Sequence, residues 1–174
     1  MREEAHGLFR RVRLGEAHAD SKDAVGVLGN LLVLASSSGP YRPFFERALE
    51  IARRAAEENP GDMAMIIVID DFAAPPDGDS RKAIQTFYRE LAPFNRYVVH
   101  VVEGIGFAAA AKRAFISLLT MSERYGFPAR VVGTIEESVP LLRQALGKSW
   151  VRQIDAQSIQ EAVHELRERR RSIV

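Results

Sequence analysis

The segment that most constrains the fold is an unbroken run of apolar residues, 63–69, with turn signals on both sides. Asn59-Pro60-Gly61 precedes the run, and Asp70 follows it. A strand with one wet face alternates between apolar and polar residues, whereas a strand covered on both faces is apolar throughout. Strands of the second kind belong to parallel sheets, whose connections are helical crossovers. The run therefore predicts an α/β fold.

Two further apolar runs, 24–28 and 31–35, are separated only by Gly29-Asn30. Both of these residues tolerate a positive φ, and a two-residue connection of this kind is typical of a tight β-hairpin. After the hairpin, segments with helical periodicity alternate with β-branched runs. Helices are expected at 43–58, 80–93, 107–125 and 134–146, and further strands at 97–102 and 129–133.

This order predicts a mixed, mostly parallel sheet of about five strands with about four helices, in which right-handed crossovers follow the hairpin. The predicted domain spans residues 23–147. A short N-terminal arm, 1–22, precedes this domain. A helical tail, 148–174, follows it and adds one C-terminal helix.

The helix at 107–125 carries a stripe rich in alanine, which we expect to pack closely against the sheet. Its members are Phe107, Ala108, Ala111, Phe115, Leu118, Leu119 and Ser122. Gly104-Ile-Gly106, just before the helix, predicts a tight strand-to-helix turn. It does not complete a dinucleotide-binding motif, because Ala109 occupies the place of the third glycine.

The start of the helix at 134–146 has two interpretations. Thr134-Ile-Glu-Glu137 fits a capping box. However, Pro140 is unfavourable in a helix interior, which would favour Ser138 as the cap.

Composition excludes several classes of protein. The 174 residues include no cysteine, which rules out disulfides, cysteine-ligated zinc and thiol catalysis and is typical of a reducing compartment. The 24 Lys and Arg nearly balance the 23 Asp and Glu, so no net charge attracts nucleic acid or an anionic membrane. The longest apolar run is too short to span a membrane. We therefore expect a cytoplasmic protein with no nucleic-acid partner and no membrane span.

The tail should form a helix that begins near Ser158 or near Asp155, since residues 158–161 fit a capping box. Ile159, Val163 and Leu166 form a narrow apolar seam along it. A helix this short is marginal in water unless it packs against something. The seam can fold back on its own sheet or dock on a second copy. The second arrangement, a homodimer, is slightly favoured because it leaves the charged face in water.

With this element order, residues 23–147 resemble the STAS-like superfamily, named after sulfate transporters and anti-sigma-factor antagonists. The closest likeness is to bacterial stand-alone proteins related to the antagonists. The patterns that carry the resemblance are the Gly29-Asn30 hairpin, the strand at 63–69 before a polar loop, Val102-Glu-Gly-Ile-Gly-Phe-Ala-Ala-Ala110 and Thr134-Ile-Glu-Glu-Ser138. Members of this superfamily are mostly non-enzymatic, so the resemblance implies a regulatory, protein-interaction role without a cofactor.

The resemblance also implies a phosphorylation site. In the antagonists, a kinase partner modifies a serine or threonine at the start of the helix after the third strand, and Asp79-Ser80 occupies that place. Arg81 stands where the family has glycine. A phosphate is favourable at a helix N-terminus, although Asp79 or Ser80 can equally be a simple helix cap. The predicted interaction surface comprises Asp70, Asp71, Asp77, Asp79, Ser80 and Arg81.

The other polar residues do not form a recognisable catalytic or metal site. The acidic loop at 70–79 lacks the spacing of a calcium-binding loop. His100 falls within a predicted strand, where a structural role is the simplest interpretation. Glu161, Glu165 and Glu168 interleave with the arginines of the tail 167–171, which is typical of a solvated helix face. We predict no catalytic residue and no metal.

Two alternatives to a non-catalytic interaction module remain. The STAS-like sheet is structurally close to the CRAL-TRIO lipid-exchange fold, and a lipid or other apolar ligand would need a pocket lined by phenylalanines. The candidates for that lining are Phe44, Phe45, Phe107 and Phe115. An enzyme would instead need a cleft that contains His100 and two of the acidic loop residues.

Overall fold

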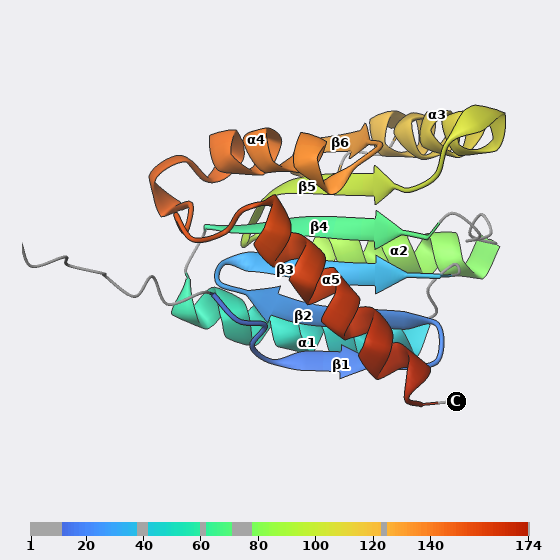
Figure 1. Cartoon of the computed structure of the whole chain (residues 1–174). Helices are drawn as coiled ribbons and strands as arrows, with labels where there is room; N and C mark the ends of the chain where they lie inside the picture. Colours follow the sequence, from blue (N-terminus) through green and yellow to red (C-terminus); the bar gives the residue numbers. More distant parts are fainter. Residues whose placement is uncertain (1–11, 38–41, 60–61, 71–77, 123–124, 174) are drawn as a thin grey trace, which may run out of the picture.

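The computed structural model describes residues 12–37, 42–59, 62–70, 78–122 and 125–173, which form an α/β fold on one six-stranded sheet (Figure 1). The strands lie in sequence order across the sheet. They are β1 (Ala17–Ala19), β2 (Asp23–Leu28), β3 (Leu31–Ser36), β4 (Met63–Ile69), β5 (Asn95–Val102) and β6 (Ala129–Val132). The helices are α1 (Arg42–Glu58), α2 (Gly78–Leu91), α3 (Gly106–Ser122), α4 (Ile135–Leu146) and α5 (Ala156–Arg171), with one 3₁₀ turn, η1 (Gly147–Ser149).

The predicted fold class is confirmed: a hairpin leads into alternating helices and strands, and a C-terminal helix follows. The pairs β1–β2 and β2–β3 are antiparallel, and β3 to β6 are parallel. β1 is an additional strand within the segment 1–22, for which the sequence predicts only an arm. It pairs with the outer edge of β2, where Ala17 lies opposite Gly26.

The β2–β3 hairpin closes at Gly29-Asn30, as the sequence predicts. Leu28 pairs with Leu31 across the turn, and Gly29 adopts a φ of 61°. Asn30 is buried, and its side-chain amide donates hydrogen bonds to the carbonyls of Asp62 at 3.0 Å and Ser149 at 2.7 Å. The turn therefore joins three segments that are far apart in the sequence.

Apolar layers cover both faces of the sheet. α1 and α2 pack on one face, and Phe44, Phe87 and Leu91 are among their buried side chains. α4 and α5 pack on the other face, and α5 crosses in front of the strands in Figure 1. β4 lies between the two layers, which explains why residues 63–69 are apolar without alternation.

Side-chain caps fix where α4 and α5 begin. Thr134 is the cap of α4, because its hydroxyl accepts a hydrogen bond from the Glu137 amide at 3.3 Å. Ser138 is therefore not the cap, and Pro140 lies inside the helix. α5 begins with a reciprocal capping box between Asp155 and Ser158, which is the earlier of its two predicted starts.

α5 packs on the chain's own sheet. Ile159, Val163 and Leu166 are all buried in the layer that α5 and α4 form over β2 to β5. The expectation that this seam contacts a second copy is wrong for these three side chains, because burial within one chain already removes them from water. The exposed charged side chains of α5 still point to solvent. Packing on the chain's own sheet therefore leaves them in water just as a dimer would.

Leu166→Ala tests this packing. Leu166 is fully buried, so its truncation leaves a cavity and should lower the free energy of unfolding by about 2–5 kcal/mol. The matched control is Glu165→Ala on the exposed side of the same turn, which should change it by about 0.5 kcal/mol or less. Urea denaturation followed by circular dichroism measures both. Equal effects of the two substitutions would contradict the packing described here.

Candidate functional site

A cluster of charged side chains lies at the carboxyl edge of the parallel strands. Asp70 directly follows β4 and Glu103 directly follows β5, so the topology brings both carboxylates to this edge. Arg167 on α5 binds both of them, at 2.5 Å from Asp70 Oδ1 and 2.6 Å from Glu103 Oε2. Arg170, one turn later, binds Asp70 Oδ2 at 2.9 Å. These ion pairs join α5 to the ends of β4 and β5.

The cluster is largely removed from water. The side chains of Asp70 and Arg170 are only 5% and 8% exposed, and that of Arg167 is 22% exposed. Burial tends to lower the pKa of Arg167, but its bonds to Glu103 and Asp70 outweigh burial, and the pKa is raised. The arginine is therefore fixed as a cation.

Asp23, the first residue of β2, extends the cluster along the same edge of the sheet, where it lies opposite Ser36 at the end of β3. Its Oδ1 accepts a hydrogen bond of 2.6 Å from the Ser36 hydroxyl, and Oδ2 is buried with no partner among the described residues. Arg170 also donates to the carbonyl of neighbouring Lys22 at 3.3 Å. Burial raises the pKa of Asp23 to about 7, although the hydrogen bond from Ser36 acts in the opposite direction.

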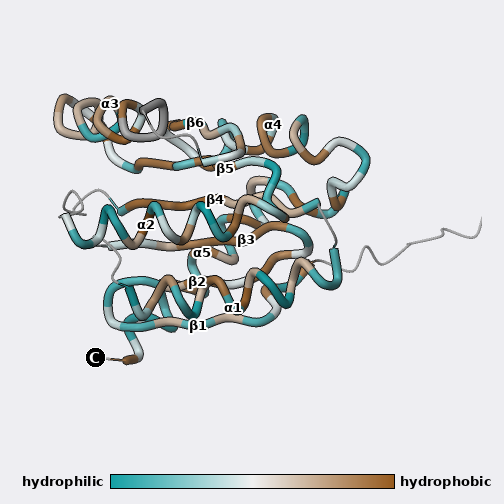
Figure 2. Tube along the Cα trace, turned by 180° about the vertical axis from the view of Figure 1, so that it is seen from behind, coloured by the Kyte–Doolittle hydropathy of each residue, from teal (hydrophilic) through white to brown (hydrophobic). Residues whose placement is uncertain are grey.

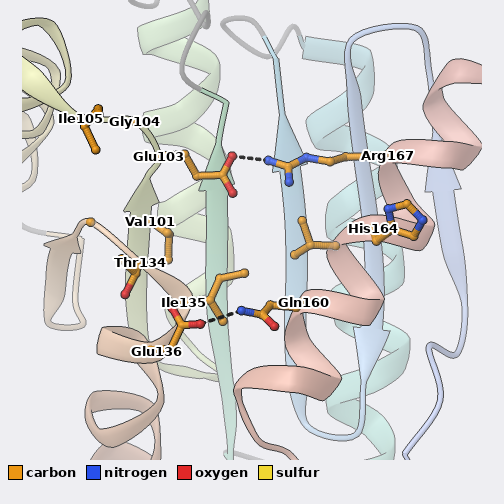
Figure 3. A pocket seen from close by; sticks show the side chains of 12 residues that line it. Val101, Glu103, Gly104, Ile105, Thr134, Ile135, Glu136, Gln160, His164 and Arg167 are labelled. Carbon is orange, nitrogen blue, oxygen red and sulfur yellow. Dashed lines mark hydrogen bonds and ion pairs between the residues drawn. The ribbon is translucent and has the colours of Figure 1, made fainter.

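Beside the cluster, an open cleft of about 400 Å³ lies between α5 and the segment that joins β6 to α4 (Figure 3). Its apolar side chains are Val101 of β5, Ile105 between β5 and α3, Ile135 of α4 and Val163 of α5. The other lining residues are Glu103, Gly104, Gly133, Thr134, Glu136, Gln160, His164 and Arg167.

Two polar bridges cross this cleft (Figure 3). One is the ion pair between Glu103 and Arg167, and in the other the Gln160 amide donates to Glu136 at 2.6 Å. The first bridge is partly buried, and the second is exposed. The cleft thus combines an apolar floor with a rim of paired polar groups.

Four of the six residues of the predicted interaction surface lie in the described parts of the chain. Asp71 and Asp77 lie outside the described residues. Asp70 is buried in the ion-pair cluster, so its assignment to an exposed surface is wrong. Asp79, Ser80 and Arg81 lie in the first turn of α2, which begins at Gly78. Asp79 and Arg81 are exposed, and Ser80 is half-buried. Because α2 starts two residues earlier than predicted, neither Asp79 nor Ser80 is its cap.

His100 is a structural residue, as the sequence suggests. It lies in β5, is buried and is 2.7 Å from the Tyr88 hydroxyl of α2, within a cluster of aromatic rings that includes Tyr125. Burial lowers its pKa to about 4. It does not line the cleft, so the arrangement on which the enzyme alternative depends, His100 beside the acidic loop residues, is not found in this cleft.

The phenylalanines proposed for a lipid pocket do not come together. Phe44 and Phe45 are buried in α1 and pack with Phe87. Phe115 of α3 lies under the Arg81 guanidinium, 6.0 Å from the ring centre, and Phe107 is 89% exposed. These four side chains therefore line no common pocket.

Among the described residues, no group of three or more histidine, aspartate or glutamate side chains is placed to hold a metal ion. No helix in the described ranges has the length and apolar content that crossing a membrane requires.

Sequence reasoning missed the arginines that organise this edge. Arg167 and Arg170 were assigned to a solvated face because glutamates alternate with them. The available signal was their spacing: Arg170 follows Leu166 by four residues and Val163 by seven, so it falls on the buried stripe of α5. An arginine on an apolar stripe needs a buried carboxylate, and Asp70 at the end of β4 provides it.

We compared the chain with known proteins: no protein-family model, no curated protein and no solved structure matches it.

The opposed pKa changes of Asp23 and His100 predict a pH effect on stability. Between pH 4 and 6.5, the unfolded chain carries a proton on His100 that the folded chain lacks, so this residue makes stability rise with pH. Over nearly the same range, the folded chain carries a proton on Asp23 that the unfolded chain lacks, which makes stability fall with pH. In the native protein the two contributions largely cancel.

Asp23→Asn should remove this cancellation. Relative to the native protein, the variant should gain about 2 kcal/mol in unfolding free energy between pH 4.5 and 6.0, because about 1.4 kcal/mol per pH unit from His100 is no longer opposed. Urea denaturation at the two pH values measures the change. His100→Gln should shift the balance in the opposite direction. An unchanged pH dependence in Asp23→Asn would show that Asp23 is ionised in the folded protein at these pH values.

Proposed function

We propose that the chain is a non-catalytic protein-interaction module of STAS-like type, which binds an extended segment of a partner protein in the cleft between α5 and the β6–α4 connection. The observation that carries this proposal is the pair of polar bridges over an apolar floor. A bound segment can pack an apolar side chain on Ile105, which lines the cleft and is 94% exposed, and exchange hydrogen bonds with the exposed bridge between Gln160 and Glu136.

Electrostatics favour binding over catalysis here. A general base or nucleophile must be available to the reacting atom. In the cleft, Glu103 and Arg167 neutralise each other, and Asp70 is held by two arginines. Groups fixed in this way maintain the shape of a surface, and their position at the carboxyl ends of parallel strands is where open α/β sheets bind ligands. The cysteine-free composition suits a module that acts in the cytoplasm.

The cleft can be tested without knowing the partner. Random peptides of about 12 residues are selected by display against the whole chain, and the strongest binder is mapped by NMR. Amide shifts are expected at 103–105, at 134–136 and along the Gln160–Arg167 side of α5. Gln160→Trp should fill the cleft and weaken binding roughly tenfold, or about 1.4 kcal/mol.

The control is Gln157→Trp, which places the same side chain one turn earlier on α5, at an exposed position that does not line the cleft. It should leave the affinity unchanged. Binders that map to another surface, equal affinities for the two variants, or a failure to select any binder would each contradict the proposed site.

We further propose that phosphorylation of Ser80 switches the module, as the resemblance to the antagonists implies. The support is position: Ser80 lies in the first turn of α2, where the helix dipole favours a phosphate and Arg81 and Lys82 add positive charge. The hydroxyl belongs to a half-buried residue, and a kinase would need only the end of the helix to reach it.

Incubation with ATP and a lysate of the producing cells, followed by phosphopeptide mapping, tests this switch. Ser80→Ala should abolish incorporation of phosphate. Thr86→Ala should leave incorporation intact, because this exposed hydroxyl lies in the middle of the same helix, away from the dipole. Phosphate found only at Thr86 or on another element would rule out Ser80.

A further inference from the structure

An ordinary surface helix turns its apolar side to the protein and its charged side to water, and α3 does the opposite. Its two cationic side chains turn towards the sheet. The Lys112 ammonium group lies 3.4 Å from the carbonyl of Asp70, and the Arg113 guanidinium donates to the carbonyl of Val102 at 3.2 Å. Among residues 106–118 of this helix, only Ala109 is buried. Ala108 and Ala111, the alanines of the stripe that the sequence assigns to the sheet, are therefore exposed rather than packed against it.

The opposite side of α3 faces water and carries no charge. Phe107, Ala111, Ala114 and Leu118 follow one another at steps of four, three and four residues, which places them on one stripe; we call it the α3 outer stripe. All four are exposed, Phe107 by 89% and Leu118 by 67%. Figure 2 shows α3 mostly in the colours of apolar residues, at the end of the sheet that β6 forms.

Large apolar side chains that lie together in water commonly mark a contact with another molecule. The position of the nearby cations distinguishes two possible occupants, a membrane surface and a second helix. A helix that lies on a membrane carries its lysines and arginines beside the apolar face, where they reach lipid phosphates. Here the cations bind backbone carbonyls on the inner side, which disfavours a bilayer. An uncharged stripe with alanines at its centre instead permits close approach of a second helix.

We propose that the occupant of the α3 outer stripe is the α3 of a second copy of this chain, packed antiparallel about a two-fold axis. The stripe is symmetric in a way that suits this arrangement. An axis that passes between Ala111 and Ala114 sets Phe107 of each copy against Leu118 of the other. Alanine then faces alanine at the crossing, where the helix axes can approach to about 8 Å.

Charge and size support a second copy as the occupant. An uncharged stripe does not repel an identical stripe, whereas most exposed helix faces of this chain carry arginine and glutamate, for example Arg53 and Glu90. A helix of this length is about 25 Å long, so one helix pair buries less than a standard interface. The dimer should therefore be weak and should depend on protein concentration.

Sedimentation velocity from about 5 to about 200 μM should show a monomer that becomes a dimer. Ala111→Glu places two carboxylates near the two-fold axis and should raise the dissociation constant at least tenfold, roughly 1.4 kcal/mol. Ala108→Glu is the matched control: it lies on the same helix and is exposed, but it is about 90° away from the α3 outer stripe. It should leave the dissociation constant unchanged. Circular dichroism verifies that both variants fold.

Single cysteines test the antiparallel geometry directly, because the chain has no cysteine of its own. Under mild oxidation, a mixture of Phe107→Cys and Leu118→Cys chains should form a disulfide-linked dimer, and Phe107→Cys alone should not. Linking of Phe107→Cys to itself would overturn the antiparallel arrangement. A protein that stays monomeric throughout this concentration range, or that instead floats with phosphatidylcholine vesicles through Phe107, would overturn the proposal of a second copy. None of these outcomes bears on the cleft.

Discussion

The ion pair between Asp70 and Arg170 is the interaction on which the position of α5 over the sheet depends. A buried carboxylate at the end of the central strand needs a cation, and that cation comes from the last helix, 100 residues later in the chain. The two arginines set the position of α5 over the sheet, and α5 in turn forms one wall of the cleft. Removal of Asp70 would leave the buried Arg170 without a carboxylate partner, which is far more costly than the loss of an exposed pair. The same contact therefore holds the fold together and shapes its candidate site.

Much of the fold was predictable because it depends on apolar periodicity and on turn chemistry. The unbroken run at 63–69, the Gly29-Asn30 turn and the alternation after it were sufficient for the fold class. β1 was not predicted, because three residues carry no measurable period. Periodicity also does not say which molecule covers a stripe: it identified the stripes of α3 and α5 equally well, placed the stripe of α3 on the sheet, and left that of α5 open between the sheet and a second copy. α5 packs within the chain, and α3 turns its stripe outward because Lys112 and Arg113 satisfy carbonyls at the strand ends.

The candidate site was harder to predict than the fold. Its residues come from β5, from the β6–α4 connection and from α5, and no short motif joins them. The sequence drew attention to the acidic loop because its charges lie close together in the chain. The structure buries Asp70 and assembles the edge from residues such as Glu103 and Arg167, which are 64 positions apart. Carboxylates and arginines paired over such a separation leave no local pattern, so only the packed sheet reveals them.

The packing of α5 also affects how the protein is made. All six strands leave the ribosome before the helix that covers their front face, so the apolar side chains of that face stay exposed during synthesis. Asn30 adds a second late contact, because its partner carbonyl at Ser149 lies 119 residues downstream. Contacts this distant form late and slow folding. A nascent chain that stalls before α5 would leave the part of this face over β2 and β3 uncovered, and such surfaces aggregate or recruit chaperones. The synthesis of α5 thus determines when the newly made chain covers this apolar face and is protected from aggregation.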